Sequence, residues 1–211
     1  MTKGFIFDFD GVIVDTESKK FKDFKKILKR YDYDLNDFSG FIGKKTSAII
    51  AERFPNMPDS VKKDVIEQRR KLQYSNMSDY KLITGMKRLI EYLKSKKYVL
   101  AITTGSERMF VNKILKIHSI LGYFDAIICG DDFIPSKPNP EGYKITLRAL
   151  KLLPKEVIVI EDSIAGIKAA KKIGCKVFAV KTYLKTDDLA KADRIFKNGF
   201  DILNYLKTED I

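Results

Sequence analysis

The segment GFIFDFDGVIVDT, residues 4–16, alternates large apolar residues with others and contains the pair Asp10-Gly11. An Asp-Gly pair between apolar runs is the strongest short-range signal for a β-hairpin, so one interpretation is a tight turn between two strands. If the segment is instead one strand, Ile6, Asp8 and Asp10 lie on the same face, because side chains alternate along a strand. A turn needs one aspartate at most, so the second aspartate requires another explanation.

The composition is that of a globular protein. The chain has 211 residues, of which 45% are hydrophobic and 11% aromatic, enough for a sizeable core. No uncharged apolar run approaches the ~18 residues of a membrane span, and Asp8 interrupts the apolar start before it could form a signal-peptide core. Cys129 and Cys175 lie in apolar runs, which favours buried free thiols. We therefore expect a soluble, cytoplasmic monomer without a membrane segment.

The net charge of +12, from 40 Lys and Arg against 28 Asp and Glu, raises the possibility of a nucleic-acid partner. The lysines after residue 16 argue against it, because they are interleaved with acids and with apolar residues at helical spacing. This pattern is typical of the solvated face of a helix. We predict no specific nucleic-acid partner, and the charge favours the attraction of small anionic substrates instead.

The spacing of apolar residues divides the chain into two parts. Within residues 17–80 it is helical, and it predicts helices after Thr16, over Thr46 to Phe54 and from Pro58 to about Ser78. From Leu82 onward the apolar runs YVLAITT, FDAIICG, EVIVIED and CKVFAV alternate with amphipathic stretches, as in parallel strands joined by helical crossovers. We predict an α/β fold: a Rossmann-like, doubly wound parallel sheet core of residues 1–15 and 82–211, with an inserted helical domain of residues 16–81.

Polar side chains follow four of the predicted strands, namely Asp8 with Asp10, Thr104-Gly105-Ser106, Lys137, and Glu161 with Asp162. Taken singly, each group could be explained by turn or helix-capping chemistry. Taken together they converge, because ligands of an open parallel sheet bind at the carboxyl ends of its strands. Four carboxylates at one edge would repel one another unless a cation lay among them, and oxygen ligands suit Mg²⁺. A magnesium ion with open coordination positions indicates a phosphate substrate.

A phosphoryl group at this edge would need hydrogen-bond donors and a positive charge, which Thr104, the backbone N–H groups near Gly105 and Ser106, and Lys137 supply. The only histidine, His118, is expected in the middle of a helix, so no Ser-His or Cys-His pair is available. An aspartate can itself attack phosphorus if a second group moves the protons. Asp8 and Asp10 fit these two roles, which explains the second aspartate.

These motifs closely resemble those of the haloacid dehalogenase superfamily of phosphatases and phosphomutases, and they occur in the same order along the chain as in that superfamily. They are DFDGV at 8–12, TTGS at 103–106, SKPNP at 136–140 and EDSIAGIKAA at 161–170. The resemblance implies that Asp8 is the nucleophile and Asp10 the acid/base. It implies that the side chains of Asp8 and Asp162 and the backbone carbonyl of Asp10 hold Mg²⁺, and that Glu161 supports this metal shell through water. It also implies that Thr104 and Lys137 bind phosphate and that Lys137 steadies the nucleophile.

The inserted segment resembles the helical C1 cap of the superfamily members that are similar to beta-phosphoglucomutase and phosphoglycolate phosphatase, a cap that closes over small substrates. True dehalogenases and the phosphonoacetaldehyde hydrolases that use a cap lysine lack the Asp-x-Asp arrangement, so Asp10 argues against both. Beta-phosphoglucomutases carry a cap histidine where this chain has Lys20, and an arginine beyond a cap glycine where it has Thr46 after Gly43.

We therefore predict a phosphatase that hydrolyses a small phosphorylated metabolite through an aspartyl-phosphate. A beta-phosphoglucomutase-type phosphomutase is the alternative, and a non-catalytic binding protein on the same scaffold is a third possibility, because fold alone does not establish activity. Lys20, Lys44 and Lys45 are candidates for contacts between the cap and an acidic substrate, although a solvated surface explains each of them as well.

Overall fold

The computed structural model describes residues 1–38, 41–42 and 46–209. The chain divides into two compact units. The core unit comprises Met1–Asp15 and Lys81–Ile211, and the helical unit comprises Thr16–Tyr80. Gly43, Lys44 and Lys45, which the sequence analysis singles out, lie outside the described residues.

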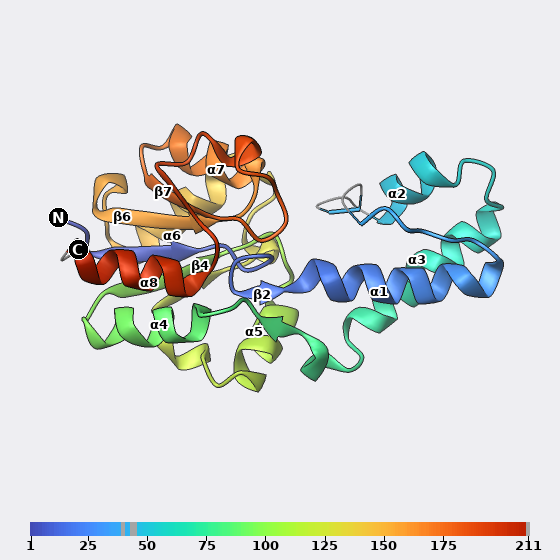
Figure 1. The fold of residues 1–211 in the computed structure, drawn as a ribbon, viewed down its shortest axis with the longest axis horizontal. Helices are drawn as coiled ribbons and strands as arrows, with labels where there is room; N and C mark the ends of the chain where they lie inside the picture. Colours follow the sequence, from blue (N-terminus) through green and yellow to red (C-terminus); the bar gives the residue numbers. More distant parts are fainter. Residues whose placement is uncertain (39–40, 43–45, 210–211) are drawn as a thin grey trace. The chain divides into compact units, whose positions relative to one another are not determined.

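The core unit is built on a six-stranded parallel sheet with the strand order β5-β4-β1-β6-β7-β8. Its strands are β1 (Gly4–Phe7), β4 (Val99–Thr103), β5 (Ala126–Ile128), β6 (Val157–Glu161), β7 (Lys176–Val180) and β8 (Arg194–Phe196). The first strand of the chain lies in the middle of the sheet, where Phe7 pairs with Ile102 of β4 and Ile160 of β6. The predicted α/β fold with a parallel sheet is confirmed (Figure 1).

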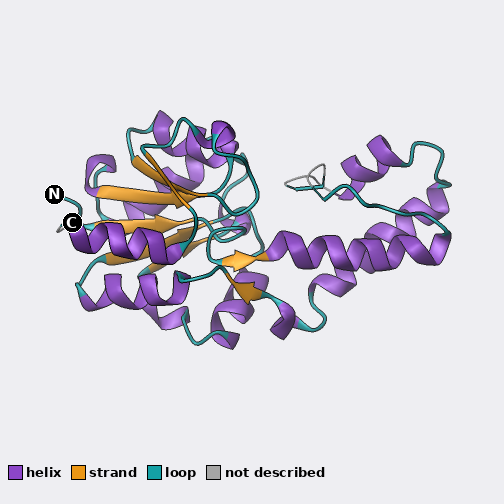
Figure 2. Cartoon of the chain, viewed as in Figure 1, coloured by secondary structure: helices purple, strands orange, loops and turns teal. Residues whose placement is uncertain are grey.

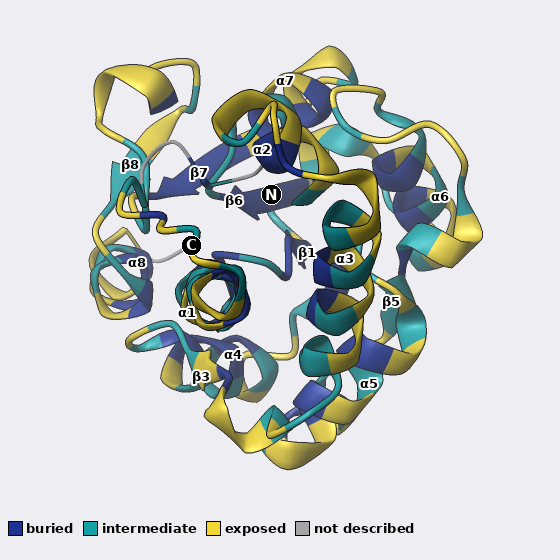
Figure 3. Cartoon of the chain, turned by 90° about the vertical axis from the view of Figure 1, so that its right-hand side faces the viewer, coloured by how far each residue is buried: buried dark blue, intermediate teal, exposed yellow. Residues whose placement is uncertain are grey.

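Helices cover both faces of this sheet (Figures 1 and 3). One face carries α4 (Met86–Ser95), α5 (Arg108–Ile117) and α8 (Gly199–Thr208), and the other carries α6 (Glu141–Leu150) and α7 (Ile164–Lys172). Val177 and Ala179 of β7 belong to the same buried cluster as Ile167 of α7. Phe178 lies on the opposite face, with its ring 5.7 Å from that of Tyr205 in α8. The inner strands β1, β4, β6 and β7 are apolar over most of their length because helices cover both of their faces.

Asp10-Gly11 does not form a hairpin between two paired strands. The short strand β2 (Val14–Asp15) pairs instead with β3 (Lys81–Leu82), in antiparallel orientation. Gly11 has a φ of +76°, and a Cβ added to it would lie 1.9 Å from Oδ2 of Asp162. Glycine is therefore required here both for its left-handed backbone and for the close approach of a second acidic side chain.

The helical unit contains α1 (Thr16–Leu28), α2 (Thr46–Arg53) and α3 (Asp59–Gln73), and no strand within its described residues (Figure 2). Phe24, Ile27 and Leu28 of α1 are fully buried in its core, as their spacing predicts. The helix α3 ends before the predicted Ser78, and Ile66, which has helical apolar spacing, is 40% exposed. Single 3-10 turns complete the chain in both units: Lys29–Tyr31, Met77–Asp79, Leu121–Tyr123, Gly130–Asp132, Pro154–Glu156 and Asp187–Leu189.

Some individual expectations are corrected and others confirmed. His118 is not in the middle of a helix: it follows the last residue of α5, because Ser119 adopts a left-handed φ of 56°. Cys129 and Cys175 are buried free thiols, as predicted. Among the described helices, none has both the length and the apolar character needed to cross a membrane.

Candidate active site

The carboxyl ends of β1, β4 and β6 bring the predicted acids, hydroxyls and lysine together. Asp8 follows β1, and its N–H donates to the carbonyl of Ile160 at 2.9 Å. Nζ of Lys137, from the loop before α6, lies 2.6 Å from Oδ1 of Asp8 and 2.5 Å from Oε1 of Glu161. Asp8, Glu161 and Asp162 each place a carboxylate oxygen within 4.8 Å of the other two. This edge therefore gathers three acidic groups around one lysine.

Asp10 is held by the turn that follows β4. The hydroxyls of Ser106 and Thr104 donate to Oδ2 of Asp10 at 2.6 Å and 3.3 Å. The N–H of Ser106 donates in turn to the Thr104 hydroxyl oxygen at 3.0 Å. A Cβ added to Gly105 would have no atom within 4 Å, so the turn borders open space. The residues predicted to bind phosphate thus lie beside the predicted acid/base, on an open side of the turn.

Both carboxylate oxygens of Glu161 are occupied by donors. Oε1 accepts from Lys137 and from the hydroxyl of Tyr143 at 2.6 Å. Oε2 accepts from the Ser163 hydroxyl at 3.0 Å and from the N–H groups of Asp162 and Ser163 at 3.1 and 3.2 Å. A Cβ added to Gly166 would lie 1.8 Å from Oε1, so only glycine leaves room for this side chain. Glu161 fixes the position of Lys137 and of the turn that carries Asp162.

Tyr143 is a site residue that the sequence analysis does not identify. It is 1% exposed, and Nζ of Lys137 lies 5.0 Å from the centre of its ring. The only sequence signal is its place on the apolar face of α6, which equally predicts an ordinary core residue.

The buried charges perturb one another. Burial raises the pKa of Asp8 to about 7; Lys137 opposes the shift, while Glu161 and Asp10 add to it. Burial, Glu161 and Asp8 raise the pKa of Asp162 well above its usual range. Burial disfavours the charged form of Lys137, yet Asp8 and Glu161 hold its pKa well above the usual value. The carboxylates thus exceed the cations at this edge, and a further cation would be bound favourably.

The donor set fits a hard divalent cation such as Mg²⁺, because every candidate ligand is an oxygen. Within the described part of the chain, the carboxylate of Asp162 accepts no hydrogen bond and that of Asp8 accepts only the one from Lys137. Since both oxygens of Glu161 are already occupied, Asp8 and Asp162 are the side chains best placed to hold the ion.

In the helical unit, a buried cation stands out. Arg69 is 7% exposed, and its Nε has no hydrogen-bond partner among the described residues. Lys19 is similarly buried but is paired with Asp23 at 2.6 Å, and Lys20 is paired with Glu17 at 2.8 Å. A buried donor without an acceptor is costly, so Arg69 is a candidate contact for an anion. The burial of Arg69 has no signal in the sequence, because Arg69 lies in the charged run EQRRK, which is typical of an exposed helix face.

Comparisons with known proteins agree with this geometry. The family model described as haloacid dehalogenase-like hydrolase matches residues 5–180. The chain belongs to this family. It is 31% identical over 176 residues to the phosphorylated carbohydrates phosphatase of Thermotoga maritima, with 80% of each chain covered. It is 30% identical over 185 residues to the phosphoglycolate phosphatase of Aquifex aeolicus, with 85% of each covered.

Among solved structures, this haloacid dehalogenase-like hydrolase is similar to the putative beta-phosphoglucomutase from Thermotoga maritima. The TM-score is 0.80 at 28% identity, covering 98% of this chain and 99% of the other. The predicted family is therefore confirmed, and the hydrolase family together with its relatives named as phosphatases supports the predicted phosphoric monoester hydrolase.

Proposed function

We propose that this haloacid dehalogenase-like hydrolase is a Mg²⁺-dependent phosphatase that releases inorganic phosphate from a small phosphorylated metabolite. The main observation is that two aspartates with different partners lie just after the central strand. Asp8 accepts a hydrogen bond from Lys137 at 2.6 Å, and Asp10 accepts one from the Ser106 hydroxyl at 2.6 Å. One carboxylate lies beside a cation and the other beside hydroxyl donors, which suits a nucleophile and an acid/base. The relatives named as phosphatases of phosphorylated carbohydrates and of phosphoglycolate support this substrate class.

The proposed reaction has two displacements at phosphorus. An oxygen of Asp8 attacks the phosphorus atom, the ester P–O bond breaks, and Asp10 gives its proton to the departing alcohol oxygen. Water then attacks the aspartyl-phosphate and loses a proton to Asp10, and the bond between Asp8 and phosphorus breaks. Inorganic phosphate leaves, and both aspartates return to their initial state. The Thr104 and Ser106 hydroxyls hold Asp10 in place.

Positive charge supports both steps. Lys137 stays protonated and orients Asp8 through their short contact, while Glu161 and Tyr143 keep Lys137 in position. Asp8 and Asp162, with the backbone carbonyl of Asp10, would hold Mg²⁺, which when bound neutralises charge on the phosphoryl group. Glu161 acts as a positioning residue.

The helical unit serves as the substrate-specific cap, and Arg69 is our candidate for its contact with a second acidic group of the substrate. The test compares Arg69→Met with Arg70→Met, a matched variant of the exposed neighbouring arginine. Arg69→Met should raise KM about tenfold or more for a phosphate ester that carries a second acidic group, and should leave unchanged the KM of an aryl phosphate whose only acidic group is the phosphate. Equal effects of both variants would contradict this role.

The phosphatase proposal is tested by measuring phosphate release with Mg²⁺ from phosphorylated sugars, phosphoglycolate, nucleotides and a generic aryl phosphate. Wild type should release phosphate from at least one of them, and no release should follow when Mg²⁺ is chelated. A clean preparation that is inactive on the whole panel, yet binds one of these esters, would favour a non-catalytic binding protein. The monomeric state and the cytoplasmic location remain predictions from the sequence.

A phosphomutase is the second candidate, because a structure named for beta-phosphoglucomutase covers nearly the whole chain. Beta-glucose 1-phosphate with a bisphosphate activator distinguishes the two. This chain has Lys20 where beta-phosphoglucomutases carry a cap histidine, and Thr46 where they carry an arginine. We therefore expect inorganic phosphate or no reaction. Glucose 6-phosphate forming faster than phosphate would establish the mutase instead.

A further inference from the structure

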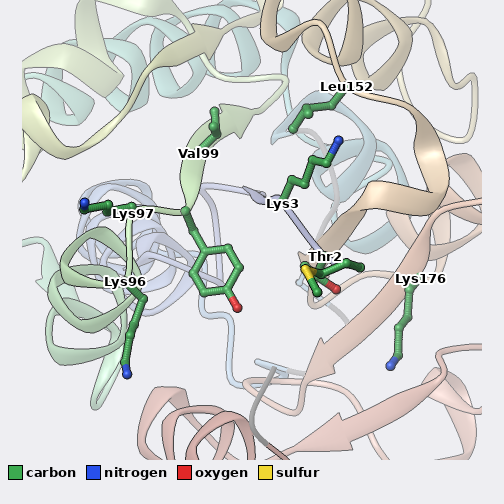
Figure 4. A pocket seen from close by; sticks show the side chains of 9 residues that line it. Thr2, Lys3, Lys96, Lys97, Val99, Leu152 and Lys176 are labelled. Carbon is green, nitrogen blue, oxygen red and sulfur yellow. The ribbon is translucent and has the colours of Figure 1, made fainter.

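The amino-terminal edge of the same sheet holds a basic pocket, shown in Figure 4. It is a cavity of about 720 Å³ at the start of β1, β4 and β7, and the lysines lining it are Lys3, Lys96, Lys97 and Lys176. Asp8 and Thr104 follow the opposite, carboxyl ends of β1 and β4. The pocket is therefore separate from the candidate active site.

Most of the positive charge in this pocket is not neutralised. Lys3 is paired with Glu156 at 2.7 Å, but among the described residues no carboxylate lies within 4.0 Å of Nζ of Lys96, Lys97 or Lys176. No described acidic residue lines the cavity. In Figure 4, Lys96 and Lys97 lie on one side of the pocket and Lys176 on the other. Like charges around one cavity favour an anion between them, and their separation favours an anion with several charges.

One wall of the pocket is apolar. Val99 and Leu152 line it together with Tyr98, which is half-buried and packs edge-on against Phe5 at 5.1 Å between ring centres. Its volume falls within the roughly 300–1,000 Å³ of small-molecule sites. An apolar wall beside several cations suits a ligand that combines a ring with a chain of phosphates.

We propose that this pocket binds a nucleoside di- or triphosphate, with its phosphates between Lys96, Lys97 and Lys176 and its base against the apolar wall. A single inorganic phosphate has no apolar part that could contact Tyr98 or Leu152. The affinity should fall as salt is raised, because the lysines are exposed and their charges are screened within about 10 Å at 0.1 M ionic strength.

The backbone of Lys97 provides a substitution that removes charge without weakening the fold. Its φ is 63°, and the N–H of Tyr98 closes the end of α4 by donating to the carbonyl of Leu93 at 3.1 Å. Glycine is the residue best suited to this left-handed position after a helix. Lys151, with a φ of 55° after α6, has the same conformation and does not line the pocket. Lys97→Gly and Lys151→Gly are thus a matched pair.

The first measurement is the affinity for ATP by titration calorimetry at low salt, in EDTA so that no metal-dependent turnover occurs. We expect wild type to bind ATP more tightly than tripolyphosphate, and both more tightly than inorganic phosphate. Lys97→Gly should weaken ATP binding about fivefold, and Lys151→Gly should not change it. Equal weakening by the two variants would overturn the proposal, because it would show attraction by net charge alone. Equal affinity for tripolyphosphate and ATP would overturn the assignment to a nucleotide.

The second measurement locates the ligand by lysine acetylation and mass spectrometry. ATP should protect Lys96, Lys97 and Lys176 but not Lys151. Protection of Lys137 alone would mean that ATP occupies the active site, and it would overturn the proposal. Because neither measurement requires turnover, an inactive enzyme that binds ATP in this pocket would contradict the phosphatase proposal and leave this one standing.

Discussion

The two edges of the core sheet both gather charged residues, but they differ in burial. At the carboxyl edge, Glu161 is fully buried and Asp8 is 7% exposed, and Lys137 bonds to both. At the amino edge, Lys96, Lys97 and Lys176 are exposed and unpaired with any described carboxylate. A buried charge without a partner is costly, whereas an exposed charge is solvated by water. Burial therefore restricts the charged side chains of the carboxyl edge to one arrangement, and substitutions there should have larger effects than substitutions at the amino edge.

The largest expected effect is the loss of catalysis in Asp8→Asn. The amide keeps the shape of the side chain but loses the attacking oxygen, so phosphate release should fall by at least about 10⁴-fold. Circular dichroism should show an unchanged fold, and Asp188→Asn, at an exposed position, should retain full activity. Activity within tenfold of wild type in Asp8→Asn would rule out the proposed nucleophile.

The next effect is on stability, in Lys137→Met. Removing this cation leaves the buried Glu161 without its ion-pair partner and Asp8 without its hydrogen-bond donor, and breaking a buried ion pair costs about 3–5 kcal/mol. Urea unfolding of the metal-free protein measures the change in the free energy of unfolding. Lys144→Met, at an exposed position of α6, is the control and should change it little. Similar losses in both variants would mean that burial does not distinguish these lysines.

The third effect is the pH dependence of stability in EDTA. The pKa of Asp8 is raised to about 7, mainly by burial, against about 3.9 in an unfolded chain. Between these values the folded protein holds a proton that the unfolded chain has lost, so the contribution of Asp8 is full below pH 4 and lost as pH rises through 7. Relative to Asp8→Asn, the free energy of unfolding of wild type should fall more steeply over this range, by at most about 1.4 kcal/mol per pH unit. Parallel pH profiles would show that the pKa of Asp8 is not raised.

The smallest effect, of opposite sign, belongs to the amino edge. Lys97→Gly relieves a left-handed backbone, and we expect it to raise the free energy of unfolding by about 1 kcal/mol. Lys96 has an ordinary φ of −85°, so Lys96→Gly should lower it instead. Urea unfolding of both variants is the measurement. A loss of stability in Lys97→Gly would show that its charge or its side-chain contacts matter more to the fold than its backbone.

The sequence locates Asp8, Thr104 and Glu161 because each lies at the end of an apolar run long enough to identify a strand, whereas Lys137 lies in the loop between β5 and α6. The parallel arrangement then brings Asp8, Thr104 and Glu161 to the same edge of the sheet. Tyr143 and Arg69 could not be predicted in this way, because an aromatic residue on an apolar helix face and an arginine in a charged run have common structural explanations. Tyr143 is distinguished by its hydrogen bond to Glu161, and Arg69 by a buried Nε without a hydrogen-bond partner among the described residues. The spacing of residues along the sequence gives no information on either feature.

Short elements escaped prediction for a related reason. The strands β2, β3 and β8 have two or three residues each, too few to show an alternation of apolar side chains. Their pairing depends on partners remote in the sequence, as with β2 and β3. The end of α5 before His118 likewise depends on the backbone of Ser119, a residue type with no strong preference for that conformation.

The central place of β1 also affects how the protein folds during synthesis. Its two neighbours begin at Val99 and Val157, so the first strand leaves the ribosome long before either partner exists. At a typical translation rate, β1 waits roughly 8 to 30 seconds until β6 is made. During that time Phe5, Ile6 and Phe7, which are fully buried in the finished protein, lack at least one of their two neighbouring strands. The nascent chain should therefore depend on chaperones until β6 emerges, and a ribosome stalled before Val157 should carry an aggregation-prone product.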